Sequence, residues 1–89
     1  MVIPFKNIFK RSDTSVFAIQ TGTFAGELWV LTKEETDNFH FLAIPTMENR
    51  TTTRDIFESG KKSGIVKLVE KLPIKVHKIC VAQFNKNAK

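Results

Sequence analysis

Cysteine, glycine and proline are scarce in this sequence and tyrosine is missing from it: the 89 residues include one Cys, four Gly, three Pro and one Trp. Because Cys80 has no second cysteine to pair with, no intramolecular disulfide can form, and we predict a reducing, cytosolic location. No apolar run is long enough for a membrane span or a secretory signal peptide, so we expect no membrane partner.

The sequence also lacks repeats, linkers and low-complexity segments, which predicts one small globular domain over residues 1–89. Hydrophobic residues make up 42% of the chain, and eight Phe supply most of the bulk for a core. A chain with this much apolar material folds rather than staying disordered.

Acidic residues are scarce in the second half of the chain. Residues 46–89 carry ten basic and four acidic side chains, whereas residues 14–45 carry one basic and four acidic side chains. The net charge of +5 therefore belongs to the C-terminal half. The excess of Lys over Arg, with abundant Ile, Phe and Asn, is typical of an AT-rich genome such as that of a phage or mobile element.

Three short segments rich in β-branched and aromatic residues predict a three-stranded antiparallel β-meander over about residues 15–45. They are SVFAIQ at 15–20, ELWVLT at 27–32 and NFHFLAI at 38–44, with the acidic loop KEETDN before the third. Both alternating faces of the third segment are largely apolar, which predicts a strand covered on both sides. Pro45 is expected to end it, and PTMENRTTT at 45–53 reads as an irregular connection.

The second half predicts an α+β fold, in which two or three helices over about residues 53–86 pack across the sheet. The first helix would be capped by Thr52 and would end at Gly60. A second helix is indicated by four apolar residues with helical spacing. They are Ile65, Leu68, Val69 and Leu72. A single helix over residues 53–72 is the alternative, with Gly60 and Gly64 on one face.

The C-terminal segment has enough β-branched residues for a strand, but its apolar residues cluster better on a helix that follows Pro73. The expected apolar stripe consists of Val76, Ile79, Cys80, Gln83 and Phe84. At the other end of the chain, Phe5, Ile8 and Phe9 would share one face of a short helix. That helix is expected to dock on the core, with a membrane-surface anchor as the alternative.

The glycine- and lysine-rich stretch ESGKKSG at 58–64 has the composition of a phosphate-binding loop but not its spacing. A P-loop needs a glycine five residues before its Gly-Lys pair and a hydroxyl directly after it. Here Asp55 and Lys62 occupy those two positions, and a carboxylate would repel phosphate. We interpret the stretch as a helix end and a junction.

Catalytic groups in a recognisable pattern are also missing. His77 and Cys80 would be neighbours on a helix, but a zinc site needs about four ligands and a nucleophilic thiol should not sit in an apolar stripe. The acidic loop at 33–38 has nothing apolar to separate the pKa values of its carboxyl groups. The FHF triplet at 39–41 resembles a base-stacking surface in composition, but core packing is the expected role of its Phe rings. We predict no enzyme activity, no metal and no cofactor.

The pattern that remains is a lysine-rich helical face. Its members are Lys61, Lys62, Lys67, Lys71, Lys75, Lys78 and Lys86. The leading hypothesis is a small accessory or regulatory protein, such as an inhibitor, that binds a protein partner. The alternative is binding of nucleic-acid phosphates by the lysine face, because Lys offers a point charge and no Arg is present there to read bases. The free edges of the sheet also allow a homo-oligomer.

Overall fold

The computed structural model of the protein describes residues 14–89, so the expected N-terminal helix and its alternative as a membrane anchor lie outside the described residues. The described chain has an α+β fold with five strands and two helices. In chain order the elements are β1 (Ser15–Ile19), β2 (Leu28–Glu34), β3 (Asn38–Ile44), β4 (Asn49–Thr53), α2 (Arg54–Ser63), β5 (Val66–Lys71) and α3 (Ile74–Asn87).

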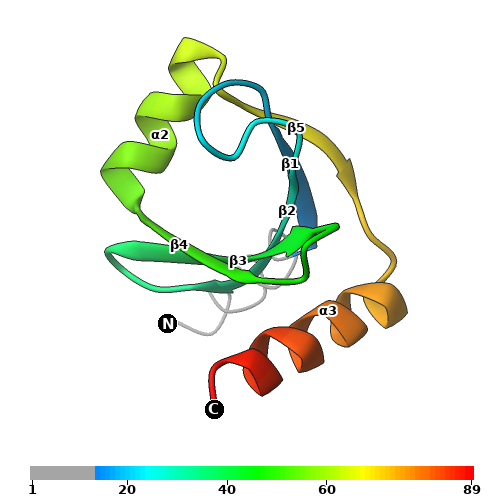
Figure 1. The fold of residues 1–89 in the computed structure, drawn as a ribbon. Coiled ribbons are helices and arrows are strands. Elements are labelled where there is room, and N and C mark those ends of the chain that lie inside the picture. Colours follow the sequence, from blue (N-terminus) through cyan, green and yellow to red (C-terminus); the bar gives the residue numbers. More distant parts are fainter. Residues whose placement is uncertain (1–13) are drawn as a thin grey trace, which may run out of the picture.

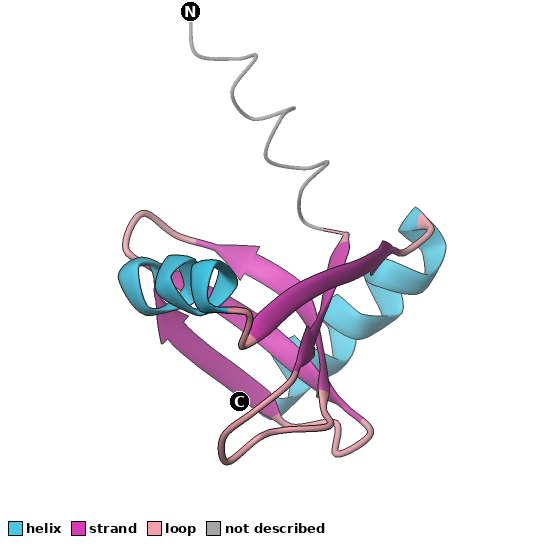
Figure 2. Ribbon diagram, turned by 90° about the horizontal axis from the view of Figure 1, so that it is seen from above, coloured by secondary structure: helices cyan, strands magenta, loops and turns pink. Residues whose placement is uncertain are grey.

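The five strands form one antiparallel sheet in the order β4-β3-β2-β1-β5. The three central strands agree with the predicted meander, and β4 and β5 extend it at its two edges. The sheet is strongly bent, and α2 covers its concave side while α3 lies across the opposite side (Figure 1). The view from above separates the two helices in the same way (Figure 2).

Each face of the sheet has its own buried cluster, which explains why β3 is apolar on both sides. Phe41 and Leu42 are neighbours on β3 and are fully buried, yet they belong to different clusters. The concave cluster includes Phe17, Trp29, Phe39, Phe41 and Phe57. The other cluster, under α3, consists of Val16, Val30, Leu42 and Cys80. The prediction of a central strand covered on both faces is confirmed.

The segment expected to be an irregular connection contains β4. Its residues pair with β3 in regular register, from Leu42 opposite Asn49 to Asn38 opposite Thr53. Three of the five β4 residues are threonine, a β-branched residue that favours strands, and the edge of β3 supplies the partner. That pairing depends on contacts between distant residues, so the local sequence did not reveal it.

The predicted ends of the first helix are each wrong. The N-cap of α2 is Thr53 rather than Thr52, and the Thr53 hydroxyl accepts a hydrogen bond from the Ile56 N–H at 3.2 Å. Gly60 does not end the helix, because α2 continues to Ser63 and Gly64 forms the C-cap with a φ of 85°. The left-handed region is open to glycine without strain.

The predicted second helix is wrong: its apolar residues lie on or next to strand β5. Gly64 turns the chain out of α2, and the free edge of β1 pairs with residues 66–71. The side chains of Leu68 and Val69 are 50% and 47% exposed, so the helical spacing does not describe a buried stripe. The alternative of a single helix over residues 53–72 is excluded by the same strand.

The predicted third helix is confirmed as α3, but its buried side is rotated relative to the expected stripe. The buried residues of α3 are His77, Cys80 and Phe84, whereas Ile79 is 68% exposed. The His77 ring Nε2 lies 2.7 Å from the backbone oxygen of Leu31, and this contact places the histidine against the sheet. The stripe expected from hydrophobicity does not include His77.

The cap at Gly64 gives a first testable prediction. An added Cβ would have no heavy atom within 4 Å, so a substitution is strained only through the backbone. We expect Gly64→Ala to lower the free energy of unfolding by about 1–2 kcal/mol, as measured by urea denaturation, because L-residues are disfavoured at this φ. Gly64→Asn, which tolerates the left-handed region, should lose less. Equal stability of Gly64→Ala and the wild type would contradict this interpretation.

Candidate functional site

α2 covers the concave side of the sheet incompletely. Only two of its residues, Phe57 and Gly60, are buried, so the helix contacts the sheet along a narrow line. A hollow therefore remains along each of its flanks. One, of about 530 Å³, lies between α2 and β5, and we name it the α2–β5 groove. The other, of about 570 Å³, lies between α2 and the loop that joins β1 to β2, and we name it the loop cleft.

The α2–β5 groove has an apolar floor and a charged rim. The floor is made by side chains of four elements, namely Phe17, Leu31, Phe39 and Phe57. The charged residues around it are Glu34, Arg54, Glu58, Lys61, Lys67 and Lys71. The floor rings are buried, so the groove offers a partner its rim, its walls and the edge of β5 rather than stacked aromatic faces.

Among residues 14–89, β5 pairs with β1 on one side, and its other side is an edge of the sheet. The Gln20 N–H donates to the Ile65 oxygen at 2.8 Å, which makes these opposed residues a hydrogen-bonded pair. In an antiparallel ladder such pairs alternate with pairs whose N–H and C=O groups point away. Leu68, which is opposite Phe17 in the same register, therefore directs its backbone groups to the free edge.

A β-bulge changes which side chains of β5 face the groove. Phe17 is opposite Leu68 while Val16 is opposite Glu70, so Val69 is the extra residue. Because directly opposed residues share a face, Lys71, opposite Ser15, returns to the same face as Leu68. Without the bulge, the period of two would have placed Lys71 on the other side of the sheet.

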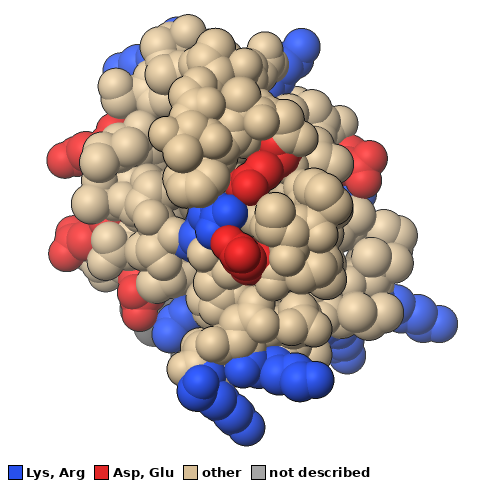
Figure 3. Space-filling model, viewed as in Figure 1, with Lys and Arg blue, Asp and Glu red and all other residues tan. Residues whose placement is uncertain are grey.

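The structure divides the seven predicted lysines between two faces. Lys61, Lys67 and Lys71 line the α2–β5 groove. Lys75, Lys78 and Lys86 lie on α3, across the sheet from α2, and they are exposed. Lys62 is exposed on α2 and does not line the groove. On the face drawn in Figure 3, basic side chains gather along the lower edge and others lie at the top, with neutral surface, acidic side chains and a central basic group between them.

The cations of the groove differ in how they are neutralised. Arg54 Nη2 lies 3.3 Å from a Glu34 carboxylate oxygen, and Lys61 Nζ lies 3.6 Å from one of Glu58. Neither Lys67 nor Lys71 forms an ion pair within residues 14–89. Two ammonium groups along β5 are thus available to a partner.

The loop cleft is mainly apolar. Its lining includes Phe24, Trp29, Ile56 and Ile65, together with hydroxyl side chains from the loop, β4 and α2. Trp29 is buried, whereas Ile56 is exposed at the surface of α2. No charge of the cleft lining other than Asp55 is available to select a ligand.

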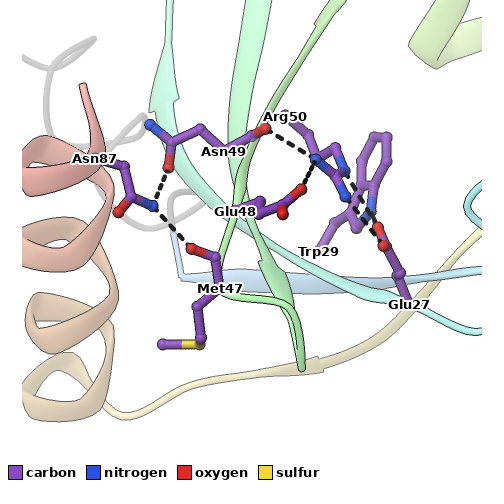
Figure 4. A network of polar contacts seen from close by, with 7 residues as sticks. All are labelled: Glu27, Trp29, Met47, Glu48, Asn49, Arg50 and Asn87. Atoms are coloured by element: carbon purple, nitrogen blue, oxygen red, sulfur yellow. Dashed lines mark hydrogen bonds and ion pairs between the residues drawn. The ribbon is translucent and has the colours of Figure 1, made fainter.

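Arg50 holds the loop cleft in shape rather than serving as a reactive group (Figure 4). Its Nε and Nη2 donate to the two carboxylate oxygens of Glu27 at 3.2 and 3.1 Å, and Trp29 Nε1 donates to the same carboxylate at 2.8 Å. The guanidinium carbon lies 4.3 Å from the Phe24 ring centroid. The network connects β4 to the loop between β1 and β2.

The hydrogen bonds from Arg50 hold the pKa of Glu27 below its ordinary value. A carboxyl group with a lowered folded pKa stabilises the protein above its unfolded pKa and loses that contribution as the pH falls through the folded pKa. We therefore expect Glu27→Gln to lower the free energy of unfolding by about 1–3 kcal/mol at neutral pH. The difference from the wild type should shrink as urea denaturation is repeated from about pH 5 down to about pH 3. A difference that is constant over this range would show that the charge of Glu27 is unimportant.

Two asparagines hold the C-terminal end of α3 to the turn between β3 and β4 (Figure 4). Asn87 Nδ2 donates to the Met47 oxygen at 2.8 Å and to Asn49 Oδ1 at 3.0 Å. Asn49 Nδ2 in turn donates to the Phe84 oxygen at 3.0 Å. With His77 near the other end of the helix, these contacts fix α3 against the sheet along its length.

The residues singled out for chemistry in the sequence are occupied by structural contacts. Glu35 is 2.8 Å from His40 Nε2 and 3.5 Å from Lys33, and the hydrogen bond from His40 lowers the pKa of this carboxyl group. Glu34 pairs with Arg54, so the acidic loop is a set of cation pairs rather than an acid–base pair. Phe39, in the FHF triplet, is buried and unavailable for stacking on bases.

Cys80 and His77 are both buried on the side of α3 that faces the sheet, and burial raises the pKa of the Cys80 thiol. A raised pKa lowers the fraction of the thiol that is ionised, and the thiolate is the form that acts as a nucleophile or metal ligand. We expect the folded protein to react with a thiol reagent such as DTNB at least about a hundredfold more slowly than the urea-unfolded chain. The absorbance of the released thionitrobenzoate measures both rates, and fast labelling of the folded protein would contradict the buried position.

Sequence reasoning missed the edge of β5 and the role of Arg54. The alternation of Val66, Lys67 and Leu68 was a strand signal, but the longer spacing of apolar residues matched a helix. Arg54 bonds to the Thr36 and Glu35 oxygens as well as to Glu34, and nothing local in the sequence indicates these partners.

Comparisons of the chain with protein-family models, with curated proteins and with solved structures find no match. Neither described helix has the length and apolar character that crossing a membrane requires. Among residues 14–89, no three His, Cys, Asp or Glu side chains gather where they could hold a metal ion.

Proposed function

We propose that this protein is a small non-enzymatic accessory or regulatory protein that binds an extended segment of a partner protein along the free edge of β5. The observation that carries the proposal is the combination at Leu68: a half-exposed apolar side chain and backbone groups directed away from β1. Proteins that bind peptides by strand addition gain affinity from such backbone groups and specificity from alternate side chains.

The opposite edge of the sheet is a poorer candidate for the same role. The edge strand β4, with the sequence NRTTT, carries no apolar side chain. β5, in contrast, has the apolar residues Leu68 and Val69 at its surface and the α2–β5 groove beside it. Apolar area that is removed from water contributes about 25 cal/mol per Å², so β5 can stabilise a complex more than β4 can.

Replacement of one backbone donor tests strand addition. Short random peptides would be displayed and selected on the immobilised wild-type protein, and the affinity of the enriched peptides would be measured by fluorescence anisotropy. We expect Leu68→Pro to weaken their binding at least about tenfold, because proline removes the outward N–H while the ladder to β1 keeps its bonds.

Two variants serve as controls. Leu68→Thr keeps the N–H and loses the apolar side chain, so it should bind more strongly than Leu68→Pro. Thr51→Pro changes the opposite edge and should bind like the wild type, provided that circular dichroism shows both proline variants to be folded. Equal binding by Leu68→Pro and the wild type, or the selection of no peptide at all, would refute the proposal.

The second candidate function is binding of nucleic-acid phosphates through α3. It is favoured by the exposed lysines Lys75, Lys78 and Lys86 on one helix, without acidic residues in that helix. Ile74 and Ile79 are exposed on the same helix, however, and apolar side chains of this size do not help to bind phosphates. Solvation of the outer face of a helix accounts equally well for its lysines, so this function ranks second.

A further inference from the structure

Resting on the proposed function, we infer that the segment bound by β5 is acidic and amphipathic: it places a carboxylate beside Lys71 and an apolar side chain beside Leu68 in the α2–β5 groove. The bulge at Val69 is the feature that brings Lys71 and Leu68 to the same face of β5. The strand β1 already places two residues that are two positions apart, Phe17 and Ser15, opposite Leu68 and Lys71, so one face of a regular added strand can meet both residues in the same way.

Charge is the first argument for an acidic ligand. Arg54 and Lys61 already lie near carboxylates of the protein, whereas Lys67 and Lys71 form no ion pair within the described part of the chain. A strand added to β5 would cover the ammonium groups of these two lysines in part. A neutral strand leaves them with less water and no partner, while an acidic strand replaces the lost water with charge-assisted hydrogen bonds.

The edge of β5 is protected against general strand pairing in a way that favours the same ligand. Lysines and bulges on edge strands discourage the addition of another chain. A ligand that supplies carboxylates turns the protective charges into attractive ones, so specificity arises from rejection of neutral and basic strands. Leu68, half exposed between the two lysines, then has an apolar partner to bury against.

Nucleic acid fits this groove less well than a peptide. The aromatic rings of the floor, Phe17, Phe39 and Phe57, are buried and cannot stack on bases. Glu34 and Glu58 at the rim would face phosphates. A second copy of the chain is disfavoured as well, because each copy brings the same unpaired lysines to the same edge.

The test uses the full chain and the peptides enriched from the random library. We expect the enriched peptides to contain alternating apolar and acidic residues, and their binding to weaken as the salt concentration rises. Lys71→Gln should weaken binding about tenfold. Lys67→Gln should weaken it less, because Lys67, opposite Ala18 in the register, starts from the other face of β5 and reaches the groove only at its rim. The control Lys75→Gln/Lys78→Gln removes two charges from α3, as many as Lys67→Gln and Lys71→Gln remove together, and should leave the affinity unchanged.

The possible results separate the inference from the proposed function. Enriched peptides that are neutral or basic, with binding that Leu68→Pro abolishes and Lys71→Gln does not affect, would overturn the acidic ligand while strand addition stands. Peptides that are not enriched at all would overturn both. Binding of a single-stranded oligonucleotide that Lys71→Gln weakens, in place of peptide binding, would assign the groove to phosphates and overturn the inference. If the molecular mass of the wild type in sedimentation rises with protein concentration, while Leu68→Pro keeps the mass of a monomer, the edge of β5 binds a second copy and the inference is overturned.

Discussion

The contact between the Phe57 ring and the concave face of the sheet is the interaction on which the candidate site depends. The Phe57 ring centroid lies 5.0 Å from that of Phe17, 4.9 Å from that of Phe39 and 5.3 Å from that of Phe41. Rings from β1 and β3 thus meet a single ring from α2, at separations typical of favourable aromatic pairs. Because α2 has no other large side chain in the core, it is held at its middle, and its two flanks stay open as the groove and the cleft.

The short distance between α2 and the start of β5 depends on Gly60, which has no side chain. An added Cβ at Gly60 would lie 3.1 Å from Val66 Cγ2, closer than most such contacts in proteins, so glycine allows the strand to approach the helix. The Ile65 N–H also donates to the Gly60 oxygen at 2.9 Å. β5 therefore begins directly against α2 and diverges from it toward Lys71. The groove opens along the part of β5 where Leu68 has its backbone groups outward.

Residue types and turns along the sequence predicted the elements that form from local preferences. They did not predict the strands that form only because a distant strand offers them an edge. The three central strands and α3 were predictable from residue types and turns, whereas β4 and β5 exist because β3 and β1 offer them free edges. The stripe of α3 is displaced because His77 bonds to the Leu31 oxygen, a contact 46 positions apart in sequence. The lysines of the candidate site were found by composition, but their division between groove and α3 required the fold.

The bulge at Val69 determines which charge lies beside Leu68 on the groove face of β5. An edge strand with apolar residues at the surface invites aggregation unless charges interrupt it. In a regular strand, Lys67 and Lys71 would share one face, and Leu68 would share the groove face with Glu70. The extra residue moves Lys71 to the face of Leu68, so each face of β5 carries one lysine. The displacement thus replaces an acidic side chain beside Leu68 with a basic one, and it gives the groove face the paired apolar and cationic groups by which it could distinguish one strand from another.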